Sequence, residues 1–499
     1  MIVRLDREEL FLIVLSVGEF RMSFPGTQKT RLGGVSPMTN ISRFRYIFIL
    51  LAAVFATVLF ADENPATTLE PFPDARFDKI CERMSQGNVD LLWVGDSIVN
   101  GFVNGPGAKI FHDRYDQRNS MSMAIGGMRT GHVLWEFDNA PVDRINPKMA
   151  VVMIGTNNVG HGKSTPAQTA EGIVAIVDRL RDLYPEIKIL LLEVFPRDPN
   201  PGDDLRRQVE EINSLIRPVY GKGKVKNVKL YSINDLFLTE EGVLTREMMK
   251  DYLHPTELGY DIWGKAVEPL IIEGLGEKPM EAVGEQGGDD WMARFNEKND
   301  LLAANKRDYQ ILMLGDSITH YWEKSAFDEQ ESLTPLWKRY YEDYGAINLG
   351  IAGDQTQNLV WRIEHYDFSK VHPRLAILMI GVNNIPTGHP FEATAYATRY
   401  IVKTIQEKCP GIKVIVLKCL PYLYMGRIEY QMMVDDYNAL LPYYFRDIED
   451  VELIDIGDMY RGEDGLVNTD FFPDRVHPNR DGYLLWGERL KSKVSEKLK

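Results

Sequence analysis

The sequence predicts two tandem three-layer α/β/α domains, each with a mostly parallel sheet of about five strands. Short apolar runs rich in Val, Ile and Leu alternate with amphipathic segments in both halves of the 499-residue chain. Such runs are typical of strands buried on both faces of a sheet, and the segments between them have helical spacing. Four blocks of the first half also recur in the second half in the same order. Together these features predict a duplicated domain with helices on both faces of each sheet.

The apolar runs occupy corresponding positions in the two halves. In the first half they are 89–95, 149–155, 187–195 and 228–233. In the second half they are 310–315, 375–381, 412–420 and 451–456. Between the runs lie segments such as 167–184, whose apolar residues recur every three or four positions, as on one face of a helix. This alternation predicts parallel pairing within each sheet, because a parallel pair needs a long crossover connection.

The four repeated blocks have nearly constant spacing. They are Gly-Asp-Ser (95–97 and 315–317), a block containing Gly127 or Gly353, Gly-x-Asn-Asn (155–158 and 381–384), and a His-Pro block with Gly-Tyr and Trp-Gly (254–264 and 477–487). The offsets between the copies are 220, 226, 226 and 223 residues. Offsets this similar over four blocks indicate a tandem duplication.

The domain boundaries follow from the repeat. The segment 274–290 is rich in Gly and Glu and poor in apolar residues, which is typical of a linker. We therefore expect a first domain over 72–273, a linker over 274–290 and a second domain over 291–499.

The N-terminal region resembles a targeting segment. Within 38–61, Arg43 and Arg45 precede a 15-residue apolar run, which fits a secretory signal peptide and is short for a membrane span. We expect 38–61 to be a signal peptide, and 1–37 to be a non-native extension before a true start at Met38. The chain would then be secreted or periplasmic, without stable membrane insertion of the mature chain. An uncleaved N-terminal anchor is the alternative.

Composition excludes some classes of function. The formal net charge is −15, whereas binding to a nucleic-acid backbone needs clustered Lys and Arg. We therefore expect no nucleic-acid partner, while a neutral or sugar-like substrate is compatible with this charge. The three cysteines are too few, and odd in number, for a disulfide framework. The oligomeric state does not follow from the sequence.

Two serines are candidate nucleophiles. Ser97 and Ser317 follow apolar runs and should lie at the carboxyl ends of strands, where open α/β sheets bind ligands. A nucleophilic serine needs a basic His that is itself oriented by a carboxylate.

Only two of the nine histidines have an Asp three residues earlier. These pairs are Asp251 with His254, and Asp474 with His477, and they occupy equivalent positions of the repeat. An isolated Asp-x-x-His is more often a helix cap, but two copies at matched distances after Gly-Asp-Ser favour two Ser-His-Asp triads.

Acyl transfer also needs donors for the developing oxyanion. Candidates are the backbone N–H groups of the serines and of Gly127 and Gly353, and the side-chain amides of Asn157 and Asn383. Taken one at a time, each glycine is as easily a turn residue and each asparagine a cap. The usual G-x-S-x-G elbow is absent, since Val99 and Thr319 stand at its last Gly position. No metal or nucleotide motif is present either, so no cofactor is implied.

The ordered blocks resemble those of the SGNH (GDSL) hydrolases. Within them, both halves resemble the group of platelet-activating-factor acetylhydrolase catalytic subunits and bacterial acetylesterases. The stretches 132–137, 358–363 and 195–213 add to the resemblance, which covers 72–275 and 285–499. The resemblance implies a flavodoxin-like fold for each half, and it assigns the roles by block: Ser97 and Ser317 as nucleophiles, His254 and His477 as bases, Asp251 and Asp474 as their partners, and Gly127, Gly353, Asn157 and Asn383 as oxyanion donors.

Two positions depart from the common family pattern. The third block ends in Asn158 and Asn384 rather than Asp, as in the acetylhydrolase-like branch. The second block opens Asn-x-Gly at 348–350 but Ser-x-Ala at 122–124, beside the first domain's candidate glycine. The latter change predicts a different pocket in the first domain without loss of a named group.

The sequence thus predicts a serine carboxylesterase in each domain that cleaves short acyl esters, in particular O-acetyl groups on carbohydrate. A small-molecule or polysaccharide ester is the expected substrate. A lipid or phospholipid ester is an alternative, although the insertions between the blocks are polar and charged. A second alternative has one domain catalytic and the other binding a glycan without hydrolysis.

Overall fold

A computed structural model of the chain describes residues 64–278, 280–284, 289–324 and 332–499. The predicted signal peptide at 38–61 and the extension at 1–37 lie outside these residues. In the described part of the chain, no helix combines the length and apolar character that a membrane crossing requires.

The first sheet has five parallel strands. They are β1 Leu91–Gly95, β2 Ser120–Ser122, β3 Met149–Met153, β4 Lys188–Leu192 and β5 Val228–Tyr231. Their spatial order is β2-β1-β3-β4-β5. The chain therefore reverses direction across the sheet between β1 and β3, which places the loops after these two strands at a switch point, where open α/β sheets bind ligands.

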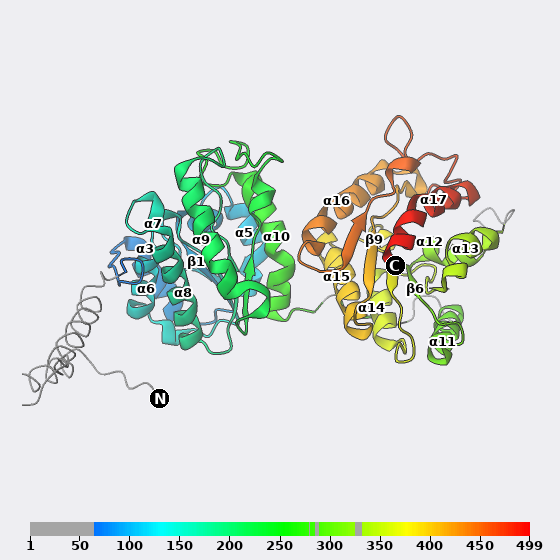
Figure 1. The fold of residues 1–499 in the computed structure, drawn as a ribbon, viewed down its shortest axis with the longest axis horizontal. Coiled ribbons are helices and arrows are strands. Elements are labelled where there is room, and N and C mark those ends of the chain that lie inside the picture. The colour runs from blue at the N-terminus through cyan, green and yellow to red at the C-terminus, as the bar shows by residue number, and fades with distance from the viewer. Residues whose placement is uncertain (1–63, 279, 285–288, 325–331) are drawn as a thin grey trace, which may run out of the picture. The chain divides into compact units, whose positions relative to one another are not determined.

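The second sheet repeats this arrangement. Its strands are β6 Ile311–Gly315, β7 Ala346–Asn348, β8 Leu375–Met379, β9 Lys413–Leu417 and β10 Val451–Ile454. They pair in parallel in the order β7-β6-β8-β9-β10, which is the first order with each strand replaced by its repeat. In Figure 1 the first sheet and its helices run from blue to green and the second from lime to red.

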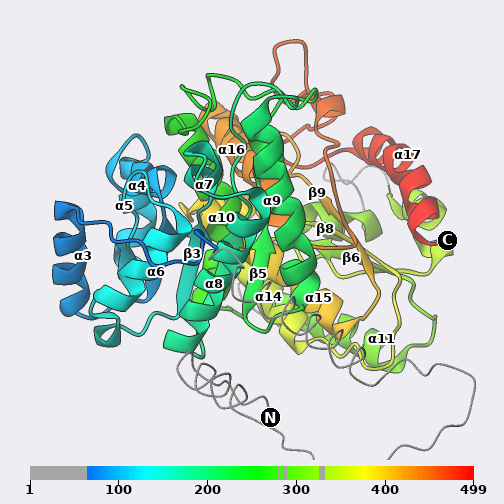
Figure 2. The ribbon, with the colours of Figure 1, turned by 60° about the vertical axis from the view of Figure 1, so that its left-hand side comes forward.

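Helices cover both faces of the first sheet. They are α3 Ala75–Ser85, α4 Ser97–Asn104, α5 Ala108–Tyr115, α6 Thr130–Asn139, α7 Thr156–Gly160, α8 Pro166–Leu183, α9 Asp204–Tyr220 and α10 Glu257–Leu275. One apolar core lies under α3, α6, α8 and α9, and a second lies under α4, α5 and α10. Helices α8 and α9 pack side by side over the sheet (Figures 1 and 2).

The second domain is built from the corresponding helices. They are α11 Asp289–Ala304, α12 Ser317–His320, α13 Thr334–Tyr340, α14 Thr356–His365, α15 Phe391–Lys408, α16 Ile428–Phe445 and α17 Arg480–Lys497. Helices α14, α15 and α16 pack in succession, and α13 packs against α17. Short 3-10 helices complete the described chain: Asp116–Arg118, Val142–Arg144, Gly221–Gly223, Asn234–Phe237, Tyr321–Glu323, Glu342–Tyr344, Val382–Asn384, Tyr424–Gly426 and Asp458–Tyr460.

The apolar runs predicted from the sequence form the buried central strands of both sheets. All five residues of β1, β3, β6 and β8 are buried, because helices cover both faces of these central strands. Helix boundaries follow local signals too: Thr165 caps α8 in a capping box with Gln168, and Pro166 occupies its first turn. The predicted fold class, two tandem α/β/α domains with five-stranded parallel sheets, is confirmed.

Candidate active site

The structure brings the first candidate triad together. Ser97 Oγ lies 2.9 Å from His254 Nε2, and His254 Nδ1 lies 2.7 Å from Asp251 Oδ2. The other oxygen of Asp251 accepts backbone N–H bonds from Leu253 at 3.1 Å and from His254 at 2.8 Å. The Asp therefore fixes the turn that carries the histidine as well as the orientation of the imidazole ring.

The second triad has nearly the same geometry. Ser317 Oγ lies 2.8 Å from His477 Nε2, and His477 Nδ1 lies 2.7 Å from Asp474 Oδ2. Asp474 Oδ1 accepts from the backbone N–H groups of Val476 and His477, at 3.0 and 2.7 Å. Both sets of side chains that the sequence paired from spacing alone are thus within hydrogen-bond distance.

A strained turn carries each Asp-His pair. The residue after the Asp, Tyr252 or Arg475, has a φ of +61° or +66°, in the left-handed region that non-glycine residues rarely adopt. The loop after β4 or β9 holds this turn: Asp198 N–H donates to the Tyr252 carbonyl at 2.9 Å, and Leu423 N–H to the Arg475 carbonyl at 3.1 Å. These bonds compensate the strain and position the base.

The glycine of each Gly-Asp-Ser has no room for a side chain. A Cβ on Gly95 would lie 2.5 Å from the Met153 carbonyl oxygen, and one on Gly315 would lie 2.4 Å from that of Met379. This close approach joins the end of the first strand of each sheet to its neighbour across the switch point. This close approach places the serine at the switch point between these two strands.

The Asp of each Gly-Asp-Ser caps the helix that the serine begins. Asp96 Oδ1 accepts from the Ile98 N–H, and Asp316 Oδ1 from the Ile318 N–H, both at 3.0 Å. The second carboxyl oxygen of each is buried and has no partner among the described residues. Burial raises the pKa of Asp96 to about 6 and that of Asp316 to about 7.

The candidate oxyanion glycines lie in tight turns. Gly127 and Gly353 both have a φ of +84°, which favours glycine. A Cβ on the preceding residue, Gly126, would lie only 3.7 Å from the Ser97 Cβ, which places this block next to the first serine.

The candidate oxyanion asparagines are anchored to the same turns. Asn157 Nδ2 donates to the Met128 carbonyl at 3.0 Å, and Asn383 Nδ2 donates to the Asp354 carbonyl at 2.9 Å. A side-chain amide carries two hydrogens, so each asparagine keeps one donor for a ligand.

The hydrogen bonds of the second asparagine of the third block explain why this position holds Asn rather than Asp. Asn158 Oδ1 accepts from the Thr130 N–H at 3.1 Å, while its Nδ2 donates to Thr130 Oγ1 at 2.9 Å. Asn384 makes the same two bonds with Thr356, at 3.0 and 3.1 Å. A carboxylate accepts only, so an amide is the group that satisfies both partners.

The first residue of the second block, Ser122 or Asn348, makes different hydrogen bonds in the two domains. Asn348 Nδ2 donates to the Thr319 carbonyl at 2.8 Å, and its Oδ1 accepts from the Gly350 N–H. In the first domain, Ser122 Oγ only accepts from the N–H two residues later. The helix that carries the nucleophile is therefore tied to the second strand of the sheet by a buried amide only in the second domain.

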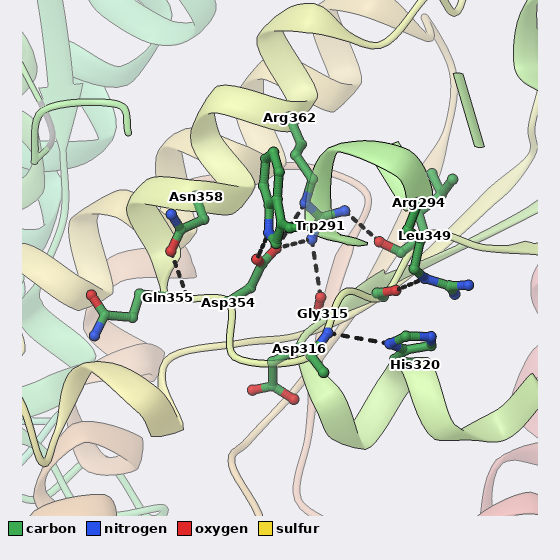
Figure 3. Close-up of polar contacts among 12 residues, drawn as sticks. Trp291, Arg294, Gly315, Asp316, His320, Leu349, Asp354, Gln355, Asn358 and Arg362 are labelled. Atoms are coloured by element: carbon green, nitrogen blue, oxygen red, sulfur yellow. Dashed lines mark hydrogen bonds and ion pairs between the residues drawn. The ribbon is translucent and has the colours of Figure 1, made fainter. Parts of the chain in front are cut away.

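A buried ion pair supports the second block of the second domain. Asp354 and Arg362 form a fully buried salt bridge, and Trp291 Nε1 donates to Asp354 Oδ1 at 2.6 Å (Figure 3). The residues at these positions of the first domain are Met128 and Glu136. Glu136 is fully buried, neither of its carboxyl oxygens has a partner among the described residues, and burial raises its pKa well above the usual range.

The two triads differ in exposure. The side chain of His254 is 41% exposed and that of His477 is 14% exposed. Tyr321 accounts for part of this difference, because its ring centroid lies 5.1 Å from that of His477. Its position in the first domain is occupied by Gly101.

Comparison with known proteins identifies the family. The GDSL-like Lipase/Acylhydrolase family matches residues 93–262 and 313–485. The chain belongs to this family. Membership makes it an ester-bond hydrolase, as the sequence predicts.

Individual relatives match about one domain each. Over 230 residues the chain is 32% identical to "Platelet-activating factor acetylhydrolase IB subunit alpha2" of Gallus gallus and 33% identical to that of Rattus norvegicus. Each alignment covers 44% of this chain and 96% of the relative. Among solved structures, "a putative platelet activating factor from Streptococcus pneumonia" is 20% identical with a TM-score of 0.36, over 41% of this chain and 92% of the other.

Several residues of these family sites were not anticipated from the sequence. Tyr260 and Tyr483 each donate a hydroxyl bond to the carbonyl of the residue after the nucleophile, at 2.8 and 2.7 Å. The repeated Gly-Tyr was a signal that could have suggested them. Arg197, in the loop after β4, left no such signal, because the corresponding residue of the second copy is Tyr422.

Proposed function

We propose that each domain hydrolyses short acyl esters, in particular acetyl esters, through a covalent acyl-serine. The observation that carries this proposal is the unbroken chain of short contacts from serine to histidine to aspartate, present twice. A nucleophile, an oriented base and a free amide donor on one crevice suit acyl transfer.

The first half-reaction acylates the serine. The His Nε2 takes the Ser Oγ proton as Oγ attacks the ester carbonyl, and the tetrahedral oxyanion accepts from the serine N–H, the glycine N–H and the asparagine amide. When the intermediate collapses, the histidine returns its proton to the leaving alcohol. Water then repeats the sequence and releases the acid.

Each Asp holds the neutral tautomer and stabilises the imidazolium that forms. Burial raises the pKa of Asp251, but the hydrogen bonds from His254 outweigh it, and the net pKa lies below the usual range. The same balance lowers the pKa of Asp474. Both groups are therefore anionic over the pH range in which histidine acts as a base.

The acyl acceptor that we propose is a carbohydrate bearing O-acetyl groups. The names of the relatives describe them as acetylhydrolases, which supports a small acyl group. The acidic net charge is compatible with a sugar-like substrate. The apolar segment at 38–61 supports a proposed location outside the cytoplasm, where such polymers occur.

A lipid ester is the second candidate, because the second domain exposes apolar side chains. Met425 is 77% exposed, and Ile428 and Met432 follow it at helical spacing on α16 with 42% and 60% exposure. A chain-length series of nitrophenyl esters separates the candidates: a sharp fall beyond four carbons supports the acetylesterase, and rising rates support the lipid esterase.

The decisive experiment labels the serines. The full chain is treated with a fluorophosphonate, and intact mass and peptide mapping count the adducts. We expect two adducts, at Ser97 and Ser317, one in each Ser→Ala variant and none in the double variant. Hydrolysis of p-nitrophenyl acetate should fall in the same order. Unchanged turnover in the double variant would refute the proposal, and loss of all turnover in one single variant would favour a non-hydrolytic partner domain.

A further inference from the structure

One position beside the triads differs in charge between the two domains. It is Arg197 after β4 and Tyr422 after β9. The structural equivalence is secure, because the next residue in each loop, Asp198 or Leu423, makes the same backbone bond to the strained turn of the triad. Arg197 is half-buried, whereas Tyr422 is 3% exposed and stacks on Tyr424, which is 41% exposed.

Arg197 is a partly desolvated cation that has no carboxylate partner among the described residues. Its Nη1 donates to the Thr156 carbonyl at 3.1 Å and to Thr156 Oγ1 at 3.2 Å, next to Asn157. Its Nε is buried and unpartnered, and Arg197 forms no ion pair within the described residues. Burial lowers the pKa of Arg197, and the charges of Asp198, Asp96 and Asp251 oppose this.

Further cationic groups gather at the same edge of the first site. His161 Nδ1 lies 3.4 Å from Arg129 Nη1, and a Cβ on the preceding Gly160 would lie 2.4 Å from Arg197 Nη1. Burial lowers the pKa of His161, and the charges of Arg129, Arg197 and Lys163 lower it further. Arg129 is already paired with Glu70, whereas Lys163 is exposed. In a chain of net charge −15, Arg197 and Lys163 thus place two cationic side chains at this edge.

The second site presents rings at the corresponding place. Tyr422 stacks on Tyr424 with centroids 5.8 Å apart and an interplanar angle of 15°, and Tyr430 closes the cluster at 6.2 and 6.0 Å. On the other side of the base, Tyr321 lies over His477. Burial raises the pKa of Tyr422, and the charges of Tyr424 and then Asp316 add to the rise.

We propose that the two catalytic centres serve different acyl acceptors, selected by this position. The first site takes an ester whose alcohol part carries an anionic group, a carboxylate or a phosphate, which Arg197 binds. The second takes an ester of an uncharged ring, which packs between Tyr321 and the Tyr422 cluster. This inference rests on the proposed function and adds to it a division of labour between the domains.

The physical reason is desolvation. A guanidinium with free donors in a partly buried site binds an anion through charge-assisted, planar hydrogen bonds. An anion facing the ring cluster, whose exposed member is Tyr424, would lose water without gaining a cation, whereas a neutral ring gains stacking and apolar contact there. Each site therefore favours one class and disfavours the other.

A matched pair of substrates tests the inference. 4-Acetoxybenzoate carries a carboxylate, and its methyl ester is the uncharged counterpart. Each is assayed with the Ser317→Ala chain, which leaves site 1, and with the Ser97→Ala chain, which leaves site 2. The kcat/KM ratio of anion to methyl ester should be at least about tenfold higher at site 1. Comparing the ratio between sites cancels the intrinsic difference between the two leaving groups.

Exchange of the two residues should move the preference. In the Ser317→Ala background, Arg197→Tyr should lower the ratio about tenfold or more through the KM of the anion, with the methyl ester nearly unaffected. In the Ser97→Ala background, Tyr422→Arg should raise it. Arg207→Met removes an exposed arginine of α9 as the matched control, and it should leave the ratio unchanged.

The outcomes are separable. Equal ratios at the two sites, or an Arg197→Tyr variant that lowers kcat/KM for both esters alike, would overturn the inference and leave Arg197 as a positioning residue for Thr156. If either site hydrolyses neither ester, the result would instead contradict the proposed function. Acetoxyphenyl phosphate provides the phosphate arm, and a preference of site 1 for it over the methyl ester supports the inference in the same way as the carboxylate.

Discussion

Substitution of Asp354 by Asn should destabilise the second domain severely. The fully buried Arg362 guanidinium takes its compensating charge from Asp354. It also donates to the carbonyls of Leu349 and Gly315 (Figure 3) and to the hydroxyl of Tyr366, so its N–H groups that do not bind Asp354 already have acceptors. Asparagine keeps an acceptor for Trp291 and nearly the same volume, so the change isolates the charge.

The size of the effect follows from burial. Removing one partner of a buried ion pair costs about 3–5 kcal/mol, because the other charge is left uncompensated. Burial acts against both charged forms here, and the pKa of Asp354 is raised by it despite the adjacent Arg362. In contrast, Asp343→Asn alters an exposed carboxylate and should change the free energy of unfolding by less than about 0.5 kcal/mol.

Amide hydrogen exchange measures this in the full chain. The β6 amides should exchange about two to nearly four orders of magnitude faster in Asp354→Asn, since each 1.4 kcal/mol is a factor of ten. Peptides from β1 serve as the internal control and should not change. The Arg362→Met, Asp354→Met and double variants complete a cycle, in which the double variant should cost about 2 kcal/mol less than the sum of the single variants.

A change below tenfold in the β6 exchange rate would refute the reasoning. It would mean that water or a rearranged side chain compensates Arg362, and that the pair is not desolvated. The activity of site 2 provides a second measurement. Because the Asp354 carbonyl accepts from Asn383, we expect kcat at site 2 to fall while kcat at site 1 is retained.

Three further predictions concern single groups. Glu136→Gln should stabilise the first domain at pH 7. Because the pKa of Glu136 is raised in the folded state, its contribution to the free energy of unfolding is present below pH about 4.5 and is lost as the pH rises toward the folded pKa. In urea melts, the difference in the free energy of unfolding between variant and parent should therefore widen from pH about 4.5 upward. A gap independent of pH would contradict this. Asn157→Ala and Asn383→Ala should each lower kcat at their own site about 10²–10³-fold without a matching rise in KM, and an equal effect on KM would argue for a structural role. Tyr260→Phe should cost about 1 kcal/mol in unfolding, since the Ile98 carbonyl loses its donor, and a neutral result would show that water replaces it.

Much of the site could be predicted because its determinants are local. Asp251 and His254 are three residues apart, so one tight turn brings them together regardless of the rest of the fold. The duplication supplied the second test, because accidental spacings do not recur with the same offset. The strands could be predicted equally well, because strands that are buried on both faces of a sheet need continuous apolar runs.

The environment of the triads could not be read in the same way. Trp322 and Tyr321 are adjacent in sequence, yet Trp322 is fully buried in the core while Tyr321 covers His477. Glu136 lies on an amphipathic helix at a position where the second domain has an arginine, and its complete burial follows only from the packing of that helix. These properties depend on neighbours distant in sequence.

The sequence by itself determined the alternation of strands and helices, the duplication, the family and the six candidate triad residues, because each depends on short-range periodicity or on the spacing of a few reactive groups. The tertiary structure decided how the two sites differ. Arg197 and Tyr422 lie in loops about 100 residues downstream of the serines, and only the parallel order of the sheet brings those loops to the same edge. Charge and burial at that edge are sums over many elements, and no local pattern encodes them.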